Sequence, residues 1–320
     1  MATRNPPPTP MAVLRGHVAP INSVSFVADG ERSQLLLSGS ADGTLKVWDL
    51  STRREKYSIQ AHSKAGILHT ATQGSSIISH GRDGMIKWWD MADGDMRESR
   101  SVACGSYTFT KTHVIDENLL LVPTEHAEMI ALVDLRASDL HPSIVLNGST
   151  LKAGMCMSLA FLPSSSTLGY PCVGFEGGPV SLFDMRSVTP LLSHSITTSS
   201  LLCMDVVSST STLLCGSSGP ELFAAVMDPS TATATSQSIY HGKKDGFSAV
   251  SNRSDARIFA TAGWDHHVRV FHRTFKPLAT LKYHTESVYS VHFSPDNRLL
   301  ASASKDHKIA LWSIYPPSNN

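Results

Sequence analysis

Short apolar runs alternate with polar turns along the chain, and one such pattern occurs four times. Each copy has an apolar run typical of a β-strand, a tight polar turn led by Asp, and a second alternating run that ends in an aromatic residue. The copies are LLLSGSADGTLKVWDL at 35–50, SIISHGRDGMIKWWDM at 76–91, IFATAGWDHHVRVFHR at 258–273 and LLASASKDHKIALWSI at 299–314. The pattern predicts a β-hairpin in each copy, and therefore a fold built from repeats.

Polar residues recur at fixed places in these four copies. The aromatic residue follows the Asp by six positions, a hydroxyl residue precedes the Asp by four, and a His ends a short apolar strand upstream. We expect a buried relay in which Asp accepts a hydrogen bond from the His ring, His contacts the hydroxyl, and the hydroxyl contacts the indole. The predicted relay residues are His17, Ser38, Asp42, Trp48, His62, Ser79, Asp83, Trp89, His241, Thr261, Asp265, His284, Ser302, Asp306 and Trp312. This set resembles the structural tetrad of WD-repeat propellers, and Phe271 in place of Trp implies that one repeat keeps only part of it.

Three weaker copies of the strand pattern lie between the clear ones, at 117–136, 170–186 and 212–228, and they lack the relay. Across all copies the position after the aromatic residue recurs at intervals of 41 to 50 residues, and the WD-repeat period is about 40 to 45 residues. We therefore predict an all-β, seven-bladed WD-repeat β-propeller as a single domain over 11–316. A Pro-rich flexible tail at 1–10 and a C-terminal tail at 317–320 flank it. Because the last copy ends on a third strand, MAVLR at 11–15 is expected to supply the missing outer strand and close the ring.

Composition argues against nucleic-acid binding, a disulfide framework, a zinc site and export. The chain is 41% hydrophobic and carries 27 basic and 27 acidic residues, so the basic excess of a nucleic-acid-binding domain is missing. Its five cysteines are odd in number and widely spaced, which signals neither a disulfide framework nor a zinc site and fits a reducing compartment. The N-terminus lacks the apolar stretch of a secretory signal, and no run is long enough to span a membrane. We expect a soluble protein that is not exported.

Extra material falls between the repeats. PSSSTLGYP at 163–171 and the Ser/Thr-rich tract DPSTATATSQS at 228–238 are both expected to be mobile loops. The tract at 228–238 has two interpretations, a phosphorylated regulatory loop or a plain tolerated insertion.

The end of the chain carries a more specific resemblance. The strings ATAGWDHHVRVFH, PLATLKYH and SASKDHKIALWSIYP within 258–316 resemble the last two blades of the family that contains guanine nucleotide-binding protein β-subunit-like proteins and the fungal WD-repeat subunit of the ASTRA complex. The resemblance implies a scaffold of nucleus and cytoplasm. Its implied partners are co-chaperone subunits that mature phosphatidylinositol-3-kinase-related kinases, and chromatin-remodelling assemblies with AAA+ ATPases. A fold by itself does not specify a function.

Catalytic and metal chemistry have little support in the sequence. Nearly every regularly placed Asp, His and Ser belongs to the predicted relay, so we expect no enzyme and no cofactor. The cluster Asp265, His266, His267 and His272 could suggest a metal, but alternate strand residues face opposite sides, which separates His267 from His272. No phosphate-binding G-x-x-x-x-G-K-[ST] loop occurs.

Propellers also serve two other functions, as G-protein β subunits and as substrate receptors of ubiquitin ligases. A G-protein β subunit has a long N-terminal helix, whereas this chain begins with a Pro-rich tail, so that function is rejected. The endings Asp134-Leu135-Arg136 and Asp184-Met185-Arg186 look like the box that docks WD proteins onto cullin-four ubiquitin ligases. A substrate receptor of such a ligase is therefore the alternative function.

The residue before each turn Asp is expected to point outward, where it could contact a partner. These residues are Ala41, Arg82, Trp264 and Lys305, and His266 follows the Asp in the same turn as Trp264. Trp and Arg are frequent anchors of protein interfaces. We predict partner contacts at Arg82, Trp264, His266 and Lys305, while the alternative for Trp264 is that its ring lies flat on a neighbouring blade.

Overall fold

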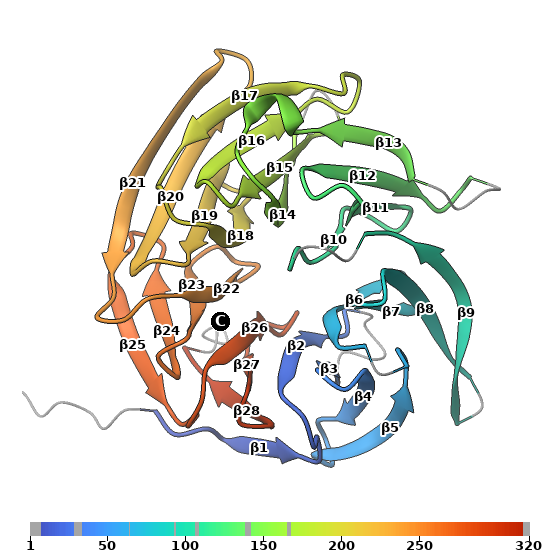
Figure 1. Ribbon diagram of the computed structural model, residues 1–320. Helices are drawn as coiled ribbons and strands as arrows, with labels where there is room; N and C mark the ends of the chain where they lie inside the picture. Colours follow the sequence, from blue (N-terminus) through green and yellow to red (C-terminus); the bar gives the residue numbers. More distant parts are fainter. Residues whose placement is uncertain are drawn as a thin grey trace, which may run out of the picture.

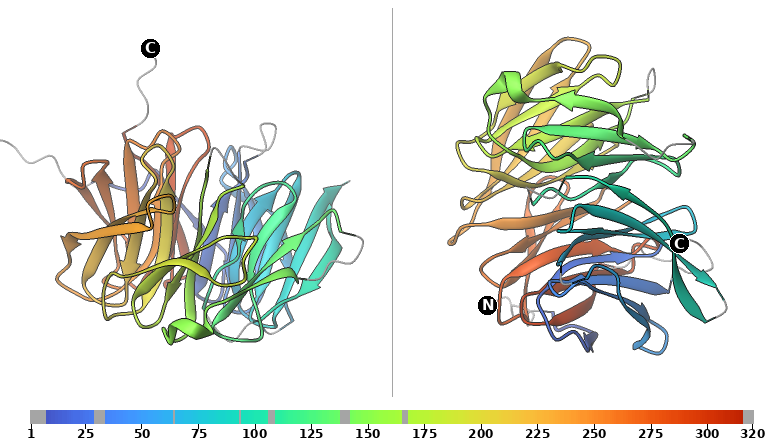
Figure 2. Two further views of the ribbon diagram at one scale, coloured as in Figure 1. Left: turned by 90° about the horizontal axis from the view of Figure 1, so that it is seen from above. Right: turned by 45° about the vertical axis from the view of Figure 1, so that its right-hand side comes forward.

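Seven four-stranded antiparallel sheets surround a central axis in the computed structural model, which describes residues 8–28, 34–63, 65–92, 94–105, 109–137, 142–164 and 168–315. Figure 1 looks along this axis, and the first strand of each sheet faces the centre. The side view in Figure 2 shows the strands stacked as a thick disc. The prediction of a seven-bladed β-propeller is confirmed.

The first four blades follow one another along the chain. Blade 1 has β2 (Ile21–Phe26), β3 (Leu35–Ser40), β4 (Thr44–Asp49) and β5 (Arg54–Gln60); blade 2 has β6 (Ile67–Gln73), β7 (Ser76–Gly81), β8 (Met85–Ala92) and β9 (Asp95–Ala103). Blade 3 has β10 (His113–Val114), β11 (Leu119–Pro123), β12 (Met129–Asp134) and β13 (Pro142–Asn147); blade 4 has β14 (Cys156–Leu162), β15 (Tyr170–Phe175), β16 (Pro179–Phe183) and β17 (Pro190–Ser195). A 3-10 turn, Ser149–Leu151, separates blades 3 and 4.

The remaining blades complete the ring. Blade 5 has β18 (Leu201–Val207), β19 (Thr212–Ser217), β20 (Glu221–Asp228) and β21 (Thr233–His241). Blade 6 has β22 (Phe247–Asn252), β23 (Ile258–Gly263), β24 (His267–His272) and β25 (Pro277–Lys282). Blade 7 has β26 (Val288–Phe293), β27 (Leu299–Ser304) and β28 (Lys308–Ser313), and its outer strand is β1 (Ala12–Arg15).

The pairing of β1 with β28 closes the ring. Ala12 lies opposite Leu311 and Arg15 opposite Lys308, and the Met11 amide donates to the Leu311 carbonyl at 2.8 Å. Figure 1 shows β1 along the outer edge of blade 7, next to β28. The predicted closing strand is confirmed, while residues 1–7 and 316–320 of the predicted tails lie outside the described residues.

The hydrophobic core consists of layers between neighbouring blades. Val268 and Val270 of blade 6 share one cluster with Val291 and Leu300 of blade 7, and every side chain in that set is less than a tenth exposed. The second and third strands of a blade are apolar on both faces because each is covered by a blade on either side, whereas the outer β5 is largely exposed. Packing between blades therefore holds the loops of adjacent blades at fixed spacing.

The Ser/Thr-rich tract at 228–238 is not a loop, and that prediction was wrong. Residues 229–232 form a tight turn, and Thr233 to Ser238 pair with β20 as the first part of β21. The tract alternates Thr with small residues, and β-branched Thr favours the extended backbone of an outer strand. Of the other predicted loop, residues 165–167 lie outside the described part, and β15 begins at Tyr170.

Candidate interaction surface

Blades 2 and 7 contain complete polar relays. In blade 7, Trp312 Nε1 donates to Ser302 Oγ at 2.9 Å, Ser302 Oγ lies 2.9 Å from His284 Nε2, and His284 Nδ1 lies 3.0 Å from Asp306. A carboxylate only accepts, so Nδ1 of His284 carries a proton and donates it to Asp306. The corresponding residues of blade 2 are His62, Ser79, Asp83 and Trp89, with separations of 2.8 and 2.9 Å. These side chains hold each blade to the loop that precedes it.

Blade 1 keeps only part of the relay, which corrects the prediction for Asp42. Trp48 donates to Ser38 at 2.8 Å and Ser38 lies 2.7 Å from His17 Nε2. Asp42 accepts instead from the Ser40 hydroxyl and the Thr44 amide. In the described part of the chain, the buried Nδ1 of His17 has no hydrogen-bond partner, and burial lowers the pKa of His17 to about 4.

Blade 6 uses a different set of contacts, and the prediction for His241 was wrong. The His241 side chain is 69% exposed, whereas its neighbour Tyr240 turns inward, with its ring 5.2 Å from that of Phe271. Arg269 pairs with Asp265 and donates from Nε to the Tyr240 hydroxyl at 3.1 Å. Adjacent strand residues point to opposite sides, so the inward Tyr240 forces His241 outward.

The remaining partner of the predicted blade 6 relay is Thr261. Its buried hydroxyl lacks a partner among the residues described, because Phe271 has no N–H to donate. The residues Asp265 and His272, which the sequence placed in a possible metal cluster, have other partners. Asp265 is paired with Arg269, and His272 Nδ1 contacts the Thr274 hydroxyl. Within the described ranges, no group of three or more His, Cys, Asp or Glu side chains could hold a metal ion.

The Asp-led turns and the loops before each first strand form one face of the ring. The amide of Arg82 donates to the Gly66 carbonyl, that of Trp264 to Gly246, and that of Lys305 to Ser287, all at 2.8 to 3.0 Å. Each bond ties the turn between the second and third strands of a blade to the loop that enters the same blade. We call this side of the ring, made of those turns and loops, the Asp-turn face.

All four positions before the turn Asp are exposed on this face, namely Ala41, Arg82, Trp264 and Lys305. Lys305 lies 3.7 Å from Glu286 in an exposed ion pair. His266 is half-buried and has a φ of 70°, at the turn position that Gly43 and Gly84 occupy in blades 1 and 2. Its backbone therefore serves the left-handed turn.

Trp264 is partly packed and partly exposed. Its side chain is 41% exposed, and a Cβ built on Gly246 would lie 2.1 Å from the indole ring. The ring thus covers the α-carbon of Gly246 in its own blade, and only Gly leaves room for it there. One part of the indole ring packs on Gly246, and the rest of the ring is open to solvent.

Phe109 is a surface residue that the repeat pattern did not reveal. It is 60% exposed in the loop that enters blade 3, and the Arg82 guanidinium lies 4.6 Å from the centre of its ring. Val18, in the loop that enters blade 1, is 83% exposed on the same face. Phe109 and Val18 fall between strands, where no periodicity marks them, so the only sequence signal was an apolar residue in a polar loop.

The two Asp-x-Arg boxes lie on the opposite face, in turns between third and fourth strands. The guanidinium of Arg136 is held by Asp134 at 2.8 and 2.9 Å. Arg186 is exposed, and its amide donates to Asp184 at 2.9 Å.

In the described residues no helix is long and apolar enough to cross a bilayer.

Comparison with known proteins agrees with this architecture. The family model described as WD domain, G-beta repeat matches residues 8–49, 234–272 and 275–313. The chain is 32% identical over 321 residues to guanine nucleotide-binding protein subunit beta-like protein 1 of Mus musculus, covering 97% of this chain and 98% of the mouse protein. It is 27% identical over 378 residues to ASTRA-associated protein 1 of Schizosaccharomyces pombe, covering 96% and 99%.

A solved structure shows the same fold. The β-propeller domain of Cps50 (Swd1) from Myceliophteria thermophila superposes with a TM-score of 0.76 at 18% identity, over 96% of this chain and 100% of that one. The seven blades, the relays of blades 1, 2 and 7, and the similarity to the mouse protein over 97% of this chain all indicate a WD-repeat propeller. The chain therefore belongs to the WD-repeat β-propeller family that includes guanine nucleotide-binding protein subunit beta-like protein 1.

Proposed function

We propose that this chain is a non-enzymatic scaffold that binds protein partners through an arc of the Asp-turn face over blades 6, 7, 1, 2 and 3. The arc carries Trp264, Lys305, Val18, Arg82 and Phe109 in that order around the ring. Exposed aromatic residues next to Arg are the side chains that most often anchor protein interfaces. The His, Ser and Asp residues of the complete relays are held by structural hydrogen bonds, which leaves them unsuited to acid-base chemistry.

The relatives indicate the kind of assembly. Several fungal relatives are named ASTRA-associated protein 1. These names support an ASTRA-like assembly, and we propose that the partners are its co-chaperone subunits, large kinase-related proteins and AAA+ ATPases. The chain would act in the nucleus and cytoplasm, in chromatin remodelling and in the maturation of phosphatidylinositol-3-kinase-related kinases.

The pairing of Arg82 with Phe109 is the observation that carries this proposal. The contact joins the turn of blade 2 to the loop that enters blade 3, and it holds an apolar ring in solvent beside a cation. A cation over an aromatic face is worth about 0.5 to 1 kcal/mol at an exposed site, too little to explain a 60% exposed Phe by stability alone. A partner that covers the ring would recover the free energy of burying it.

The test is an affinity purification from cell extract, with identification of the bound proteins. The wild-type chain is compared with the double variant Arg82→Glu and Phe109→Ala, and with Arg186→Ala as a matched change on the opposite face. We expect the double variant to lose kinase-related and AAA+ partners while Arg186→Ala retains them. If Arg186→Ala alone loses its partners, and these include a ubiquitin-ligase adaptor, the opposite face is the binding surface and the proposal is wrong.

A further inference from the structure

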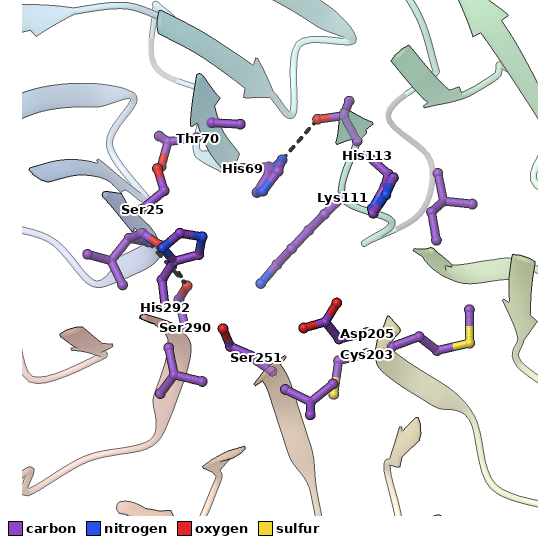
Figure 3. Close-up of a pocket in the computed structure, with 18 of the residues that line it drawn as sticks. Ser25, His69, Thr70, Lys111, His113, Cys203, Asp205, Ser251, Ser290 and His292 are labelled. Carbon is purple, nitrogen blue, oxygen red and sulfur yellow. Dashed lines mark hydrogen bonds between the residues drawn. The ribbon is translucent and has the colours of Figure 1, made fainter. Parts of the chain in front are cut away.

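The seven innermost strands enclose a channel of about 460 Å³. Hydroxyl, imidazole and small apolar side chains line most of it, as Figure 3 shows. Two charged side chains, those of Lys111 and Asp205, also face the lumen. A volume of this size admits a ligand group of several non-hydrogen atoms together with water.

The backbone on both sides of Lys111 is anchored to neighbouring inner strands. The Thr110 hydroxyl donates to the Cys156 carbonyl at 2.6 Å, and the Thr112 hydroxyl lies 2.9 Å from His69 Nδ1. Figure 3 shows the Lys111 side chain extended from this segment across the lumen. The fold thus directs a long cationic side chain into the channel from a fixed base.

The Lys111 ammonium has no partner among the residues that the structure describes. Across the described residues, no ion pair or hydrogen bond involves it, and burial lowers the pKa of its amino group. Lys111 is half-buried, and an ammonium group that is partly shielded from bulk water without a counter-charge is less stable than a paired one. The site therefore has an unmet requirement for acceptor atoms.

Asp205 does not meet this requirement. Its carboxylate accepts hydrogen bonds from the Asn252 amide at 2.6 Å and from its own strand neighbour Val206 at 2.8 Å. Burial raises the pKa of Asp205 to about 6. Backbone donors therefore hold the carboxylate on the channel wall, and among the described residues it forms no ion pair with Lys111.

A second donor comes from His292. Its Nδ1 accepts the Phe26 amide proton at 3.3 Å, so the neutral ring carries its proton on Nε2. Burial lowers the pKa of His292 to about 4, which keeps this ring neutral at pH 7. The channel lining thus combines one cation with a neutral N–H donor.

We propose that the channel binds a carboxylate or phosphate group, with Lys111 as its cationic anchor and His292 as a neutral donor. The group has two sources, an acidic side chain of a protein partner or a free small anion. Lys111 lies two residues after Phe109, so a partner segment seated on the Asp-turn face would start beside the entrance to this site. The free-anion source does not depend on the proposed scaffold function.

Thermal melts of the purified chain test the anchor. Wild type, Lys111→Met and the exposed control Lys276→Met are melted in sodium chloride, and then in sodium phosphate at equal ionic strength. Without phosphate, Lys111→Met should melt at or above the wild-type temperature, because Met fills the same space without the unpaired charge. With phosphate at saturation, wild type and Lys276→Met should rise by about 3 °C or more and Lys111→Met should not.

A second arm separates the two sources. A capped hexaglutamate peptide is titrated against the same three proteins, with hexaglutamine as its control. A saturable rise with phosphate supports a free anion, and a rise with hexaglutamate alone supports an acidic side chain, provided Lys111→Met abolishes it. The proposal is overturned if neither probe shifts the wild type, if Lys111→Met responds as the wild type does, or if Lys111→Met melts several degrees early without any anion.

Discussion

The Asp306 carboxylate lies 3.0 Å from Nδ1 of His284, and both side chains are almost completely shielded from solvent. Burial alone would raise the pKa of Asp306, but the hydrogen bond and charge of His284 and two backbone donors lower it below its usual value. The pair joins the loop that enters blade 7 to the turn between its second and third strands. In the described residues of blade 1 the corresponding atom of His17 has no acceptor.

The first prediction concerns the stability of this pair. Asp306→Ala should lower the free energy of unfolding by about 1 to 3 kcal/mol, because it leaves a buried His284 N–H without an acceptor. Asp228→Ala, in a blade without the relay, removes contacts to Ser230 and Thr231 in a surface turn and should cost less. Denaturant midpoints of the two variants measure the difference. Equal midpoints would mean that the relay of blade 7 does not form.

The second prediction concerns ring closure. Removing residues 1–15 should lower the melting temperature strongly, because it deletes β1 and leaves the edge of β28 unpaired. Removing residues 1–9 spares β1 and should leave the melting temperature nearly unchanged. Calorimetric melts of both truncations decide the matter, and equal melting temperatures would contradict the role of β1.

The third prediction separates binding from packing on the Asp-turn face. Phe109→Ala should weaken partner binding by about 2 kcal/mol, roughly thirtyfold, with little change in melting temperature, because the ring is mostly exposed. Trp264→Ala should weaken binding too, but it should also lower the melting temperature, because the indole covers Gly246. A pull-down beside a thermal melt of each variant checks both. A stable Phe109→Ala chain that recovers every partner would remove Phe109 from the interface.

The fourth prediction concerns acid. Burial lowers the pKa of four histidines to about 4, namely His17, His80, His113 and His292. A pKa below the unfolded value of about 6.5 gives stability that is complete above pH 6.5 and is lost as the pH falls toward 4, by on the order of 1 to 3 kcal/mol per histidine. Asp205 acts in the opposite direction, since burial raises its pKa to about 6, but it is one group against these four histidines and His69, whose pKa burial also lowers.

We therefore expect the urea midpoint to fall between pH 6.5 and 4. His80→Gln should make the fall shallower by about one proton, since glutamine does not titrate. The Nδ1 atom of His80 is buried and lacks a hydrogen-bond partner among the described residues, and burial outweighs the contacts with Gly105 and Asp83 that favour the protonated ring. Identical pH profiles for His80→Gln and wild type would exclude His80 as a source of the acid sensitivity.

The repeat pattern was sufficient to predict the ring, its closing strand, and the relays of blades 2 and 7. Those features depend on residues at fixed spacing, and spacing is visible in a sequence. The Asp42 contact was not predictable in this way, because Ser40 donates to Asp42 whereas Ser304, at the same place in blade 7, donates to the Glu286 and Ser287 carbonyls and leaves Asp306 to His284. Blade 2 has Gly81 at the corresponding place, so Asp83 remains available to His62.

The features with no repeat signal were missed for a related reason. Tyr240 displaces His241 because of tertiary packing on Phe247 and Phe271, which a local pattern does not contain. Phe109 and Lys111 lie in a loop whose position is set by blades on both sides. Their importance follows from what surrounds them in space, namely Arg82 for one and the open channel for the other.

The pairing of Ala12 with Leu311 also sets the order in which the molecule is assembled. At about 5 to 20 residues per second, a ribosome needs about 15 to 60 s to synthesise the roughly 300 residues between the two strands. During that time β1 has no partner, and the blades already made carry an open edge that can pair with another chain. The first strand of the ring to be synthesised is therefore the last to find its partner, and until then the growing ring exposes an unpaired strand edge to other chains.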